Sequence, residues 1–358
     1  MAIHLGLLCA SAILAVLVCV AAQGGSSRFP AIMVFGDSTL DPGNNNNINT
    51  PAKANFPPYG RDFPGRIPTG RFTNGKLSSD YLASALGIKD LVPAYLDRSL
   101  SSNDLLTGVS FASAGSGYDN MTAESGNVIA LWKQVQYFRE YISRITSIVG
   151  AERASSIVSN SLYYLAAGNA DWGVSYFFNI GNAQNNRAMN YTIPQYTDLL
   201  INSGLGTITD LYNAGARKFI VAGLSILGCS PSERTFLAVA GRPCNARIND
   251  ASAYFNRHWA PALSNLESSL PGSTIVYSDI YDIVVDAVAY PFRYGFIDPT
   301  RGCCGTGLVE VGRDCARAAA ISCPDASRFL WWDSVHPTSA MYEIIANLVM
   351  QRDVPRLP

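Results

Sequence analysis

Five short apolar runs alternate along the chain with longer segments in which apolar residues recur at helical spacing. Short runs of this kind are typical of a parallel sheet, whose strands are buried on both faces and joined by helix-sized connections. We therefore predict an α/β fold, a three-layer α/β/α sandwich around a five-stranded parallel sheet. The predicted strands are 32–35, 108–112, 162–166, 218–224 and 274–277, and the predicted helices are about 77–86, 128–149, 194–214, 246–270 and 339–351.

The bulk composition sets further limits. With 358 residues, 48% of them hydrophobic, the chain can bury a large core, and no break in composition divides residues 27–352. One domain is therefore predicted over that range. The net charge is −1 and no basic run is present, so the charge pattern offers no surface for nucleic acid. We expect no nucleic-acid partner, and we expect a monomer.

The N-terminal segment resembles a secretory signal. Leu5 to Ala22 is an unbroken stretch of apolar and small residues, and the polar segment 23–27 follows it. We predict a signal peptide over 1–22, a secreted or cell-wall location, and no stable membrane span after cleavage. The basic end is weak, with His4 alone, and the apolar run is slightly long. The alternative is an uncleaved anchor, which would place the protein in a Golgi or other secretory-pathway membrane.

Cysteines gather in the last third of the chain, partly in an irregular segment from about 291 to 326. An even number in a secretory context predicts disulfides, although six cysteines allow 15 pairings and the sequence does not choose among them. Zinc is the competing interpretation, but no C-x-x-C pair or suitably spaced histidine supports it. We expect no metal and no organic cofactor. The cysteines are Cys229, Cys244, Cys303, Cys304, Cys315 and Cys323.

Two N-glycosylation sequons fit the same compartment. They begin at Asn120 and Asn190, each followed two residues later by threonine. They predict a glycoprotein, although motifs this short also arise by chance.

The first apolar run stops abruptly at Gly36-Asp37-Ser38. The carboxyl ends of parallel strands face the ligand crevice, so a serine just past a central strand is well placed for chemistry. The alternative is that Asp37 and Ser38 only cap a following helix, since both residue types favour that position. An Asn-, Pro- and Gly-rich segment then extends to Gly75 and is predicted to be an ordered surface loop that carries function.

A serine nucleophile needs a base, commonly an imidazole oriented by a carboxylate. Between residues 27 and 358 the sequence has two histidines. His258 lies inside a helical segment without an adjacent acid, which favours a surface or packing role. His336 follows Asp333 by three residues, and one turn of backbone can bring that carboxylate to the imidazole Nδ1. The alternative is a chance Asp-x-x-His pattern. With the strand-end serine, the pair predicts a Ser38, His336 and Asp333 triad.

Several blocks of this chain resemble the GDSL esterase/lipase family, the plant-type branch of the SGNH hydrolases. The resemblance covers nearly all of residues 27–358 and implies the flavodoxin-like SGNH hydrolase fold. No G-x-S-x-G motif is present, which argues against an α/β-hydrolase. The resembling blocks are 35–38 with Asp41 and 43–45, then 70–75, 108–117, 215–219, 303–307 and 333–337.

The resemblance also implies roles for the site residues. Ser38 is the expected nucleophile, His336 the general base and then acid, and Asp333 the group that fixes the imidazole tautomer. In this family the oxyanion is bound by the serine N–H, a glycine N–H and an asparagine amide. Ser38 and Gly115 are the expected backbone donors.

The third oxyanion donor departs from the family pattern. Gly168-Asn169-Ala170-Asp171 stands where G-x-N-D is expected, so Ala170 occupies the asparagine position. Asn169 is one residue early, and we expect a shift in the loop to bring its amide into the hole. Without it, the loss of one donor costs on the order of 3 kcal/mol, or about a hundredfold in rate.

We therefore predict a secreted serine esterase that hydrolyses carboxylic esters through an acyl-enzyme. Family activities imply acyl lipids, cutin-type esters or acetylated cell-wall polysaccharides as substrates, and the absence of a long amphipathic lid favours a short acyl or polysaccharide ester. The alternatives are an acyltransferase or polymer synthase with the same triad, and a glycan-binding protein that has lost the chemistry. Aromatic residues that could stack on sugars or pack on acyl chains, although most are expected in the core, are Trp172, Tyr176, Phe177, Phe178, Trp331 and Trp332.

Overall fold

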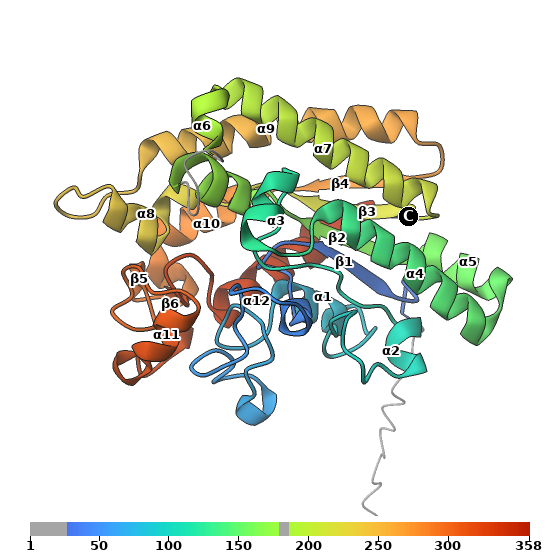
Figure 1. Cartoon of the computed structure of the whole chain (residues 1–358), viewed down its shortest axis with the longest axis horizontal. Coiled ribbons are helices and arrows are strands. Elements are labelled where there is room, and N and C mark those ends of the chain that lie inside the picture. Colours follow the sequence, from blue (N-terminus) through green and yellow to red (C-terminus); the bar gives the residue numbers. More distant parts are fainter. Residues whose placement is uncertain (1–26, 179–185) are drawn as a thin grey trace, which may run out of the picture.

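The central sheet has four regular parallel strands among the residues that the computed structural model describes, 27–178 and 186–358. The predicted signal peptide at 1–22 lies outside these residues. The strands follow one another across the sheet in chain order, and Ile32 is in register with Leu162 (Figure 1). They are β1 (Ile32–Gly36), β2 (Leu162–Ala166), β3 (Lys218–Ala222) and β4 (Thr274–Ser278).

The predicted fifth strand lies along the free edge of β1 but is too irregular to count as a strand. The N–H of Val34 donates to the carbonyl of Val109 (3.1 Å), and the N–H of Phe111 donates back to Val34 (2.7 Å). Only Ser110 forms a bridge with β1, and it runs parallel. With this segment included, the strand order is the flavodoxin-like 2-1-3-4-5. The predicted three-layer α/β/α fold is confirmed.

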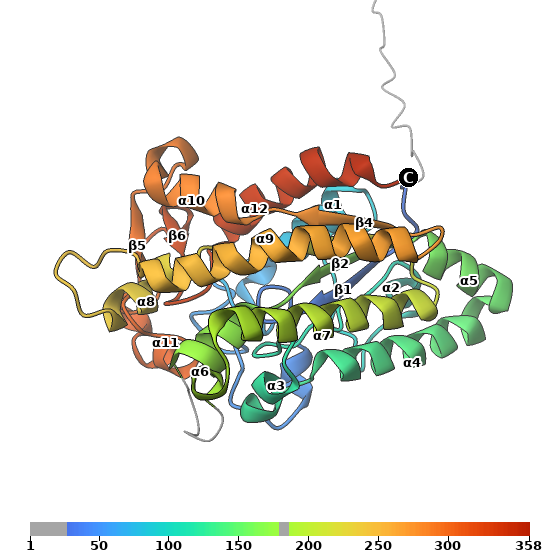
Figure 2. The same ribbon diagram turned by 90° about the horizontal axis from the view of Figure 1, so that it is seen from above.

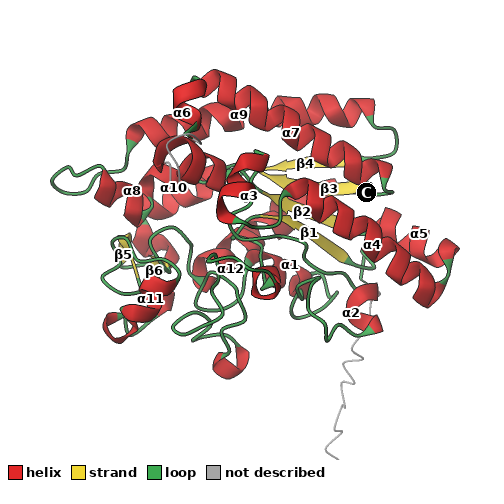
Figure 3. Ribbon diagram, viewed as in Figure 1, coloured by secondary structure: helices red, strands yellow, loops and turns green. Residues whose placement is uncertain are grey.

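Alternate residues of each strand face opposite helical layers. Met33 and Phe35 lie in one buried cluster, and Ile32 and Val34 lie in another. Both clusters are apolar because helices cover both faces of a parallel sheet (Figure 3). One layer contains α4 (Leu131–Val149), α5 (Ala151–Asn160), α7 (Ile193–Asn213) and α9 (Ala246–Ser269), and the other contains α1 (Ser78–Ala85), α10 (Tyr281–Ala289) and α12 (Ser339–Leu348).

The long helices begin and end close to their predicted limits, and Figure 2 shows α7 and α9 side by side across the sheet. The predicted last helix continues past α12 as a short π-helix, η9 (Val349–Asp353). The helix α5 was not predicted, and it is separated from α4 by Gly150, whose φ is +81°. Shorter helices are α2 (Ser102–Leu106), α3 (Asn120–Gly126), α6 (Arg187–Asn190), α8 (Pro231–Phe236) and α11 (Arg313–Arg317), with a π-helix, η3, at Asp171–Phe178.

A third, smaller core lies under the cysteine-rich segment. There β5 (Asp298–Gly302) pairs in parallel with β6 (Phe329–Trp331), a sheet that the sequence did not predict. Tyr59 and Trp332 pack in this core against the disulfides. All six cysteines pair, as predicted, in the bonds Cys229–Cys244, Cys303–Cys323 and Cys304–Cys315. Within the described residues, no helix combines the length and apolar character needed to cross a membrane.

Candidate active site

The strand β1 ends at Gly36, a position that only glycine can occupy. Gly36 has φ +139°, and a Cβ there would collide with the carbonyl of Ala166 on β2. The buried Gln134 of α4 holds both backbone groups of Gly36: its amide oxygen accepts the Gly36 N–H (2.9 Å), and its NH₂ donates to the Gly36 carbonyl (2.9 Å). The end of β1 is thus fixed in direction. Gln134 was missed from the sequence, where a glutamine on the buried face of a helix was the available signal.

Asp37 and Ser38, the two polar residues after Gly36, make different contacts. Asp37 is buried and accepts the N–H (2.9 Å) and hydroxyl (2.7 Å) of Thr39, so it stabilises a turn over 37–40 and not the helix that the alternative interpretation expected. Burial raises the pKa of Asp37. Ser38 is half-buried, and its Oγ lies 2.8 Å from Nε2 of His336. The structure therefore brings together two residues that are 298 positions apart in the sequence.

Asp333 and His336 form a compact local turn. Nδ1 of His336 lies 2.8 and 2.9 Å from the two carboxylate oxygens of Asp333, which is fully buried. The same carboxylate accepts the N–H groups of Val335 (2.9 Å) and His336 (2.7 Å). This geometry assigns the Nδ1–H tautomer, because Nδ1 must donate to the carboxylate. Nε2 is then an acceptor for the hydroxyl of Ser38.

Two aromatic residues from the loop before α1 support this pair, and neither was predicted. The hydroxyl of Tyr59 donates to Asp333 (2.8 Å) and accepts the N–H of Gly312 (2.7 Å). Burial, followed by the negative charge of Asp333, raises the pKa of Tyr59 well above its usual range, so the hydroxyl remains a donor. The ring of Phe72 lies 4.9 Å from that of His336, centroid to centroid.

The disulfide-linked segment also holds the histidine loop. The N–H of Cys304 donates to the carbonyl of Trp332 (2.7 Å), and the N–H of Trp332 donates to the carbonyl of His336 (2.7 Å). The N–H of Ser334 donates to the carbonyl of Glu310 (2.9 Å) in the same segment. The cysteine-rich region therefore contributes to the scaffold of the site.

The Asn-rich loop connects Ser38 to the neighbouring segment 110–114. Asp41 accepts the N–H groups of Gly43 and Asn44 (both 2.7 Å) with one oxygen and the N–H of Ala114 (2.9 Å) with the other. Burial raises the pKa of Asp41 to about 6. The amide of Asn44 donates to the carbonyls of Ser110 and Ala112 (both 2.8 Å). These bonds place Gly115, the next residue along, beside the loop that carries Ser38.

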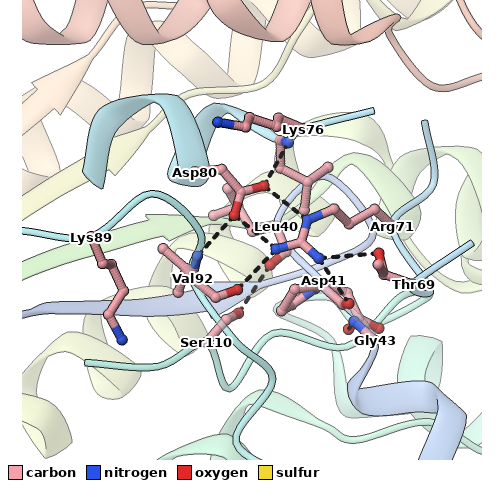
Figure 4. Close-up of polar contacts among 12 residues, drawn as sticks. Leu40, Asp41, Gly43, Thr69, Arg71, Lys76, Asp80, Lys89, Val92 and Ser110 are labelled. Atoms are coloured by element: carbon pink, nitrogen blue, oxygen red, sulfur yellow. Dashed lines mark hydrogen bonds and ion pairs between the residues drawn. The ribbon is translucent and has the colours of Figure 1, made fainter. Parts of the chain in front are cut away.

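A buried ion pair between Arg71 and Asp80 holds the C-terminal part of the same loop (Figure 4). Arg71 donates to Asp80 through Nε (2.8 Å) and Nη2 (2.7 Å), and both side chains are nearly inaccessible to solvent. Its remaining donors reach the carbonyls of Pro42 (3.4 Å) and Val92 (3.0 Å). Arg71 thereby joins the segment after Ser38 to α1 and the segment after it, with a bidentate, charge-assisted contact to Asp80.

Two backbone N–H groups at the site lack an acceptor. Within the described residues, neither the N–H of Ser38 nor that of Gly115 makes a hydrogen bond. Gly115 sits in a turn with φ +85°, a conformation that glycine adopts at little cost. Backbone donors without a partner near a serine hydroxyl are what an oxyanion requires.

Asn169 lies between the loops that follow β1 and β3. Its side-chain oxygen accepts the N–H of Ser225 (3.3 Å), and its amide is near enough to Asp37 to lower the pKa of that carboxyl. Asp171 instead turns away and accepts the N–H of Tyr118 (2.7 Å). Burial raises the pKa of Asp171 to about 8. The amide of Asn169 is thus beside the residue that precedes Ser38.

The other predicted residues lie as follows. His258 is exposed, and its Nδ1 contacts the carbonyl of Tyr254 in its own helix (2.8 Å). Asn120 and Asn190 are exposed, so both sequons remain predictions. Phe177 and Phe178 are half-buried. The aromatic residues found in the core, as expected for most of that set, are Trp172, Tyr176, Trp331 and Trp332.

Glu233 of α8 supplies a prediction about stability. It is 4% exposed, and one of its oxygens has no hydrogen-bond partner in the described part of the chain. Burial raises its pKa from 4.5 to about 8. Between these pH values the folded protein keeps a proton that the unfolded chain has released, so raising the pH destabilises the fold. The cost levels off above about pH 8.

We expect the Glu233→Gln variant to escape this penalty. Relative to wild type, its free energy of unfolding should rise from pH 5 to pH 8 by up to roughly 3 kcal/mol. Urea denaturation at several pH values measures the difference. Glu152→Gln, an exposed glutamate on α5, is the control and should show no such trend. A constant difference for Glu233→Gln across this range would contradict the prediction.

A hydrogen-bonded serine, histidine and aspartate at the carboxyl edge of a parallel sheet is the arrangement found in serine hydrolases. Comparison with known sequences gives the family. The chain belongs to the GDSL-like lipase/acylhydrolase family, whose model matches residues 32–349. The predicted membership is confirmed, and the chain is a hydrolase that acts on ester bonds.

Its relatives in Arabidopsis thaliana match over nearly their full length. GDSL esterase/lipase At5g63170 is 45% identical over 91% of this chain and 92% of its own. GDSL esterase/lipase EXL3 is 42% identical over 91% of this chain and 88% of its own. GDSL esterase/lipase At1g20120 is 42% identical over 92% of this chain and 81% of its own.

Proposed function

We propose that the protein is a secreted serine esterase that cleaves carboxylic esters through a Ser38 acyl-enzyme. The observation that carries the proposal is the continuous hydrogen-bond path from the Ser38 hydroxyl through the His336 ring to the buried carboxylate of Asp333. A weakly nucleophilic hydroxyl becomes reactive when an oriented imidazole can take its proton.

The steps of the reaction follow from this path. Ser38 Oγ attacks the ester carbonyl while Nε2 of His336 takes the hydroxyl proton. The tetrahedral intermediate collapses to the acyl-enzyme, and the imidazolium gives that proton to the departing alcohol. Water then enters, loses a proton to His336, attacks the acyl carbon and releases the acid, and the proton returns to Ser38. Asp333 keeps the imidazole in one tautomer and stabilises its charged form throughout.

The oxyanion hole is built from the N–H groups of Ser38 and Gly115 and the amide of Asn169. The support is that the two N–H groups lack an acceptor within the described residues and that the amide of Asn169 is close to Asp37. Ala170, at the family's asparagine position, has no side-chain donor.

Replacing Asn169 tests the third donor. We expect Asn169→Ala to lower kcat by about a hundredfold or more, because one preformed donor to the oxyanion is lost. KM should change little, since the ground-state ester carries no full charge to stabilise. Steady-state kinetics with p-nitrophenyl acetate measures both parameters, and Asn190→Ala, an exposed asparagine, is the control. A change of kcat below threefold would assign the hole to backbone groups alone.

Export to the cell exterior is part of the proposal. Three disulfides are typical of proteins that fold in an oxidising compartment, and both sequons present an exposed asparagine. The apolar segment at 5–22 would supply the signal. Expression of the full chain, followed by N-terminal sequencing of the protein in the medium, tests cleavage near Ala22.

Labelling with a fluorophosphonate tests the central claim. Wild-type protein should be modified at Ser38, as identified by peptide mass spectrometry, and should release p-nitrophenol from short esters. Folded protein that is neither labelled nor active would instead favour a glycan-binding role. Addition of a competing alcohol separates hydrolysis from acyl transfer: a new ester in place of free acid would assign the protein as a transferase.

A further inference from the structure

Exposed apolar side chains gather beside the histidine loop. Val335, the residue before His336, is 40% exposed, Val309 is 44% exposed and Phe236 is 59% exposed. They come from three separate segments of the chain. A single exposed apolar residue is ordinary, but a contiguous group next to a site suggests a ligand.

Hydrogen bonds show that the three segments are in direct contact. The N–H of Ser232 donates to the carbonyl of Ser334 (3.0 Å), whose own N–H donates to Glu310 (2.9 Å). The hydroxyl of Thr235 donates to the carbonyl of Leu308 (3.2 Å). Each of the three exposed apolar residues is the immediate neighbour in sequence of one of these bonded residues. They therefore belong to one surface.

Phe178 adds a fourth apolar residue to this surface. Its ring lies 5.1 Å from that of Phe236, centroid to centroid. It is the last residue of η3, which begins two residues after Asn169. We call Val335, Val309, Phe236 and Phe178 the apolar strip. Figure 1 shows α8 near β5 and β6, beyond the carboxyl ends of the strands. Ser38 lies at the same edge of the sheet, because it follows the last residue of β1 by two positions.

The charged groups next to the strip are bound to their own chain. The carboxylate of Glu310 accepts the hydroxyl of Thr306 (2.6 Å) and the N–H of Val309 (3.2 Å). The guanidinium of Arg242 donates to the carbonyls of Pro231 (3.0 Å) and Thr300 (3.1 Å). The strip itself has no side-chain hydrogen-bonding group. A hydrocarbon chain would bury apolar surface against the strip, whereas the hydroxyls of a sugar would gain no hydrogen bond from it.

The position of the strip relative to His336 indicates which half of the ester it contacts. In the proposed mechanism His336 protonates the departing oxygen, so the alcohol must leave on the side of the imidazole. The strip begins at the adjacent residue. We infer that the apolar strip binds the hydrocarbon chain of the alcohol half of the ester, which makes esters of aliphatic alcohols the preferred substrates. This inference rests on the proposed esterase function.

A series of n-alkyl acetates from ethyl to hexyl tests the inference. All members give the same acetyl-enzyme, and their alcohols are equally good leaving groups, so differences in kcat/KM report contacts with the alcohol chain. A partly exposed strip should raise kcat/KM about twofold per methylene, or roughly fifteenfold from ethyl to hexyl acetate. If deacylation is the slow step, all members of the series should have the same kcat, because they share the acetyl-enzyme.

Variants locate the effect. Phe236→Ala should lower kcat/KM for hexyl acetate roughly fivefold and leave ethyl acetate within about twofold of wild type. Val309→Thr, which keeps the shape but replaces a methyl group with a hydroxyl, should lower kcat/KM for hexyl acetate about twofold. Phe292→Ala is the matched control, because Phe292 is 79% exposed but lies at Pro291–Tyr294 after α10. It should leave the series unchanged. Thermal melting checks that each variant is folded.

Other outcomes would overturn the inference. Equal kcat/KM for ethyl and hexyl acetate would remove the strip as a subsite while leaving the esterase intact. A Phe236→Ala effect confined to a series of ethyl esters with growing acyl chains would assign the strip to the acyl half instead. Acetylated xylan turned over faster than hexyl acetate would favour a sugar. Absence of both turnover and Ser38 labelling would end the proposed function and, with it, this inference.

Discussion

The Ser38→Ala variant is expected to lose about a millionfold in kcat on p-nitrophenyl acetate. The substitution removes the single oxygen that lies 2.8 Å from Nε2 of His336. Without a nucleophile, no acyl-enzyme forms, and the base has no proton to take. The oxyanion donors remain, so a residual acceleration over water of about 10³ to 10⁴ is still expected.

The controls for this experiment lie in the same chain. Ser264→Ala removes an exposed hydroxyl on α9 and should keep full activity. Ser38→Ala should melt within a few degrees of wild type, because Ser38 is only half-buried. Fluorophosphonate labelling should vanish in Ser38→Ala and persist in Ser264→Ala. If Ser38→Ala kept more than a tenth of wild-type kcat, the nucleophile would have to be sought elsewhere.

The Asp333→Asn variant is expected to lower kcat by about 10⁴-fold. In the wild-type protein the carboxylate of Asp333 accepts the Nδ1–H of His336. In the variant, the asparagine amide can present its NH₂ to the ring, which favours the tautomer with the proton on Nε2. Nε2 would then face Ser38 as a donor and could not take its proton. The rate of fluorophosphonate labelling should fall with kcat, since both need the activated hydroxyl.

Two further variants separate this effect from a loss of structure. Tyr59→Phe removes one donor to Asp333 but keeps the carboxylate and should cost far less than Asp333→Asn, about tenfold. Asp314→Asn changes an exposed, ion-paired aspartate and should have no effect on kcat. If Asp333→Asn and Tyr59→Phe lowered kcat equally, Asp333 would act by packing and not by holding the tautomer.

The layered architecture could be predicted because its signals are local. A strand buried on both faces is a short apolar run, and a covering helix shows apolar residues at helical spacing. The segment 108–112 shows the limit of this reasoning. It has the composition of a strand, yet it forms bridges at Ser110 alone, to Val34 of β1 on one side and to Ala94 on the other. Pairing of this kind depends on neighbours that are distant in sequence.

The residues of the candidate site likewise fall into those that a local sequence pattern predicts and those that it does not. Asp333 and His336 were visible as a pair because they are three positions apart in the sequence, and a single turn joins them. Tyr59 was not visible, because its bond to Asp333 spans 274 positions and leaves no pattern near either residue. Gln134 was equally hidden, since its contact with Gly36 joins a helix to a strand end 98 positions away.

The sequence alone therefore determined the order of strands and helices, the serine at the end of the first strand and the acid–histidine turn, since each depends on neighbouring residues. Only the tertiary structure decided that Ser38 meets His336, how the cysteines pair, and that Phe236, Val309 and Val335 share one surface. These contacts arise when the helices pack on the sheet and bring the loops at its carboxyl edge together, and no local pattern encodes that meeting.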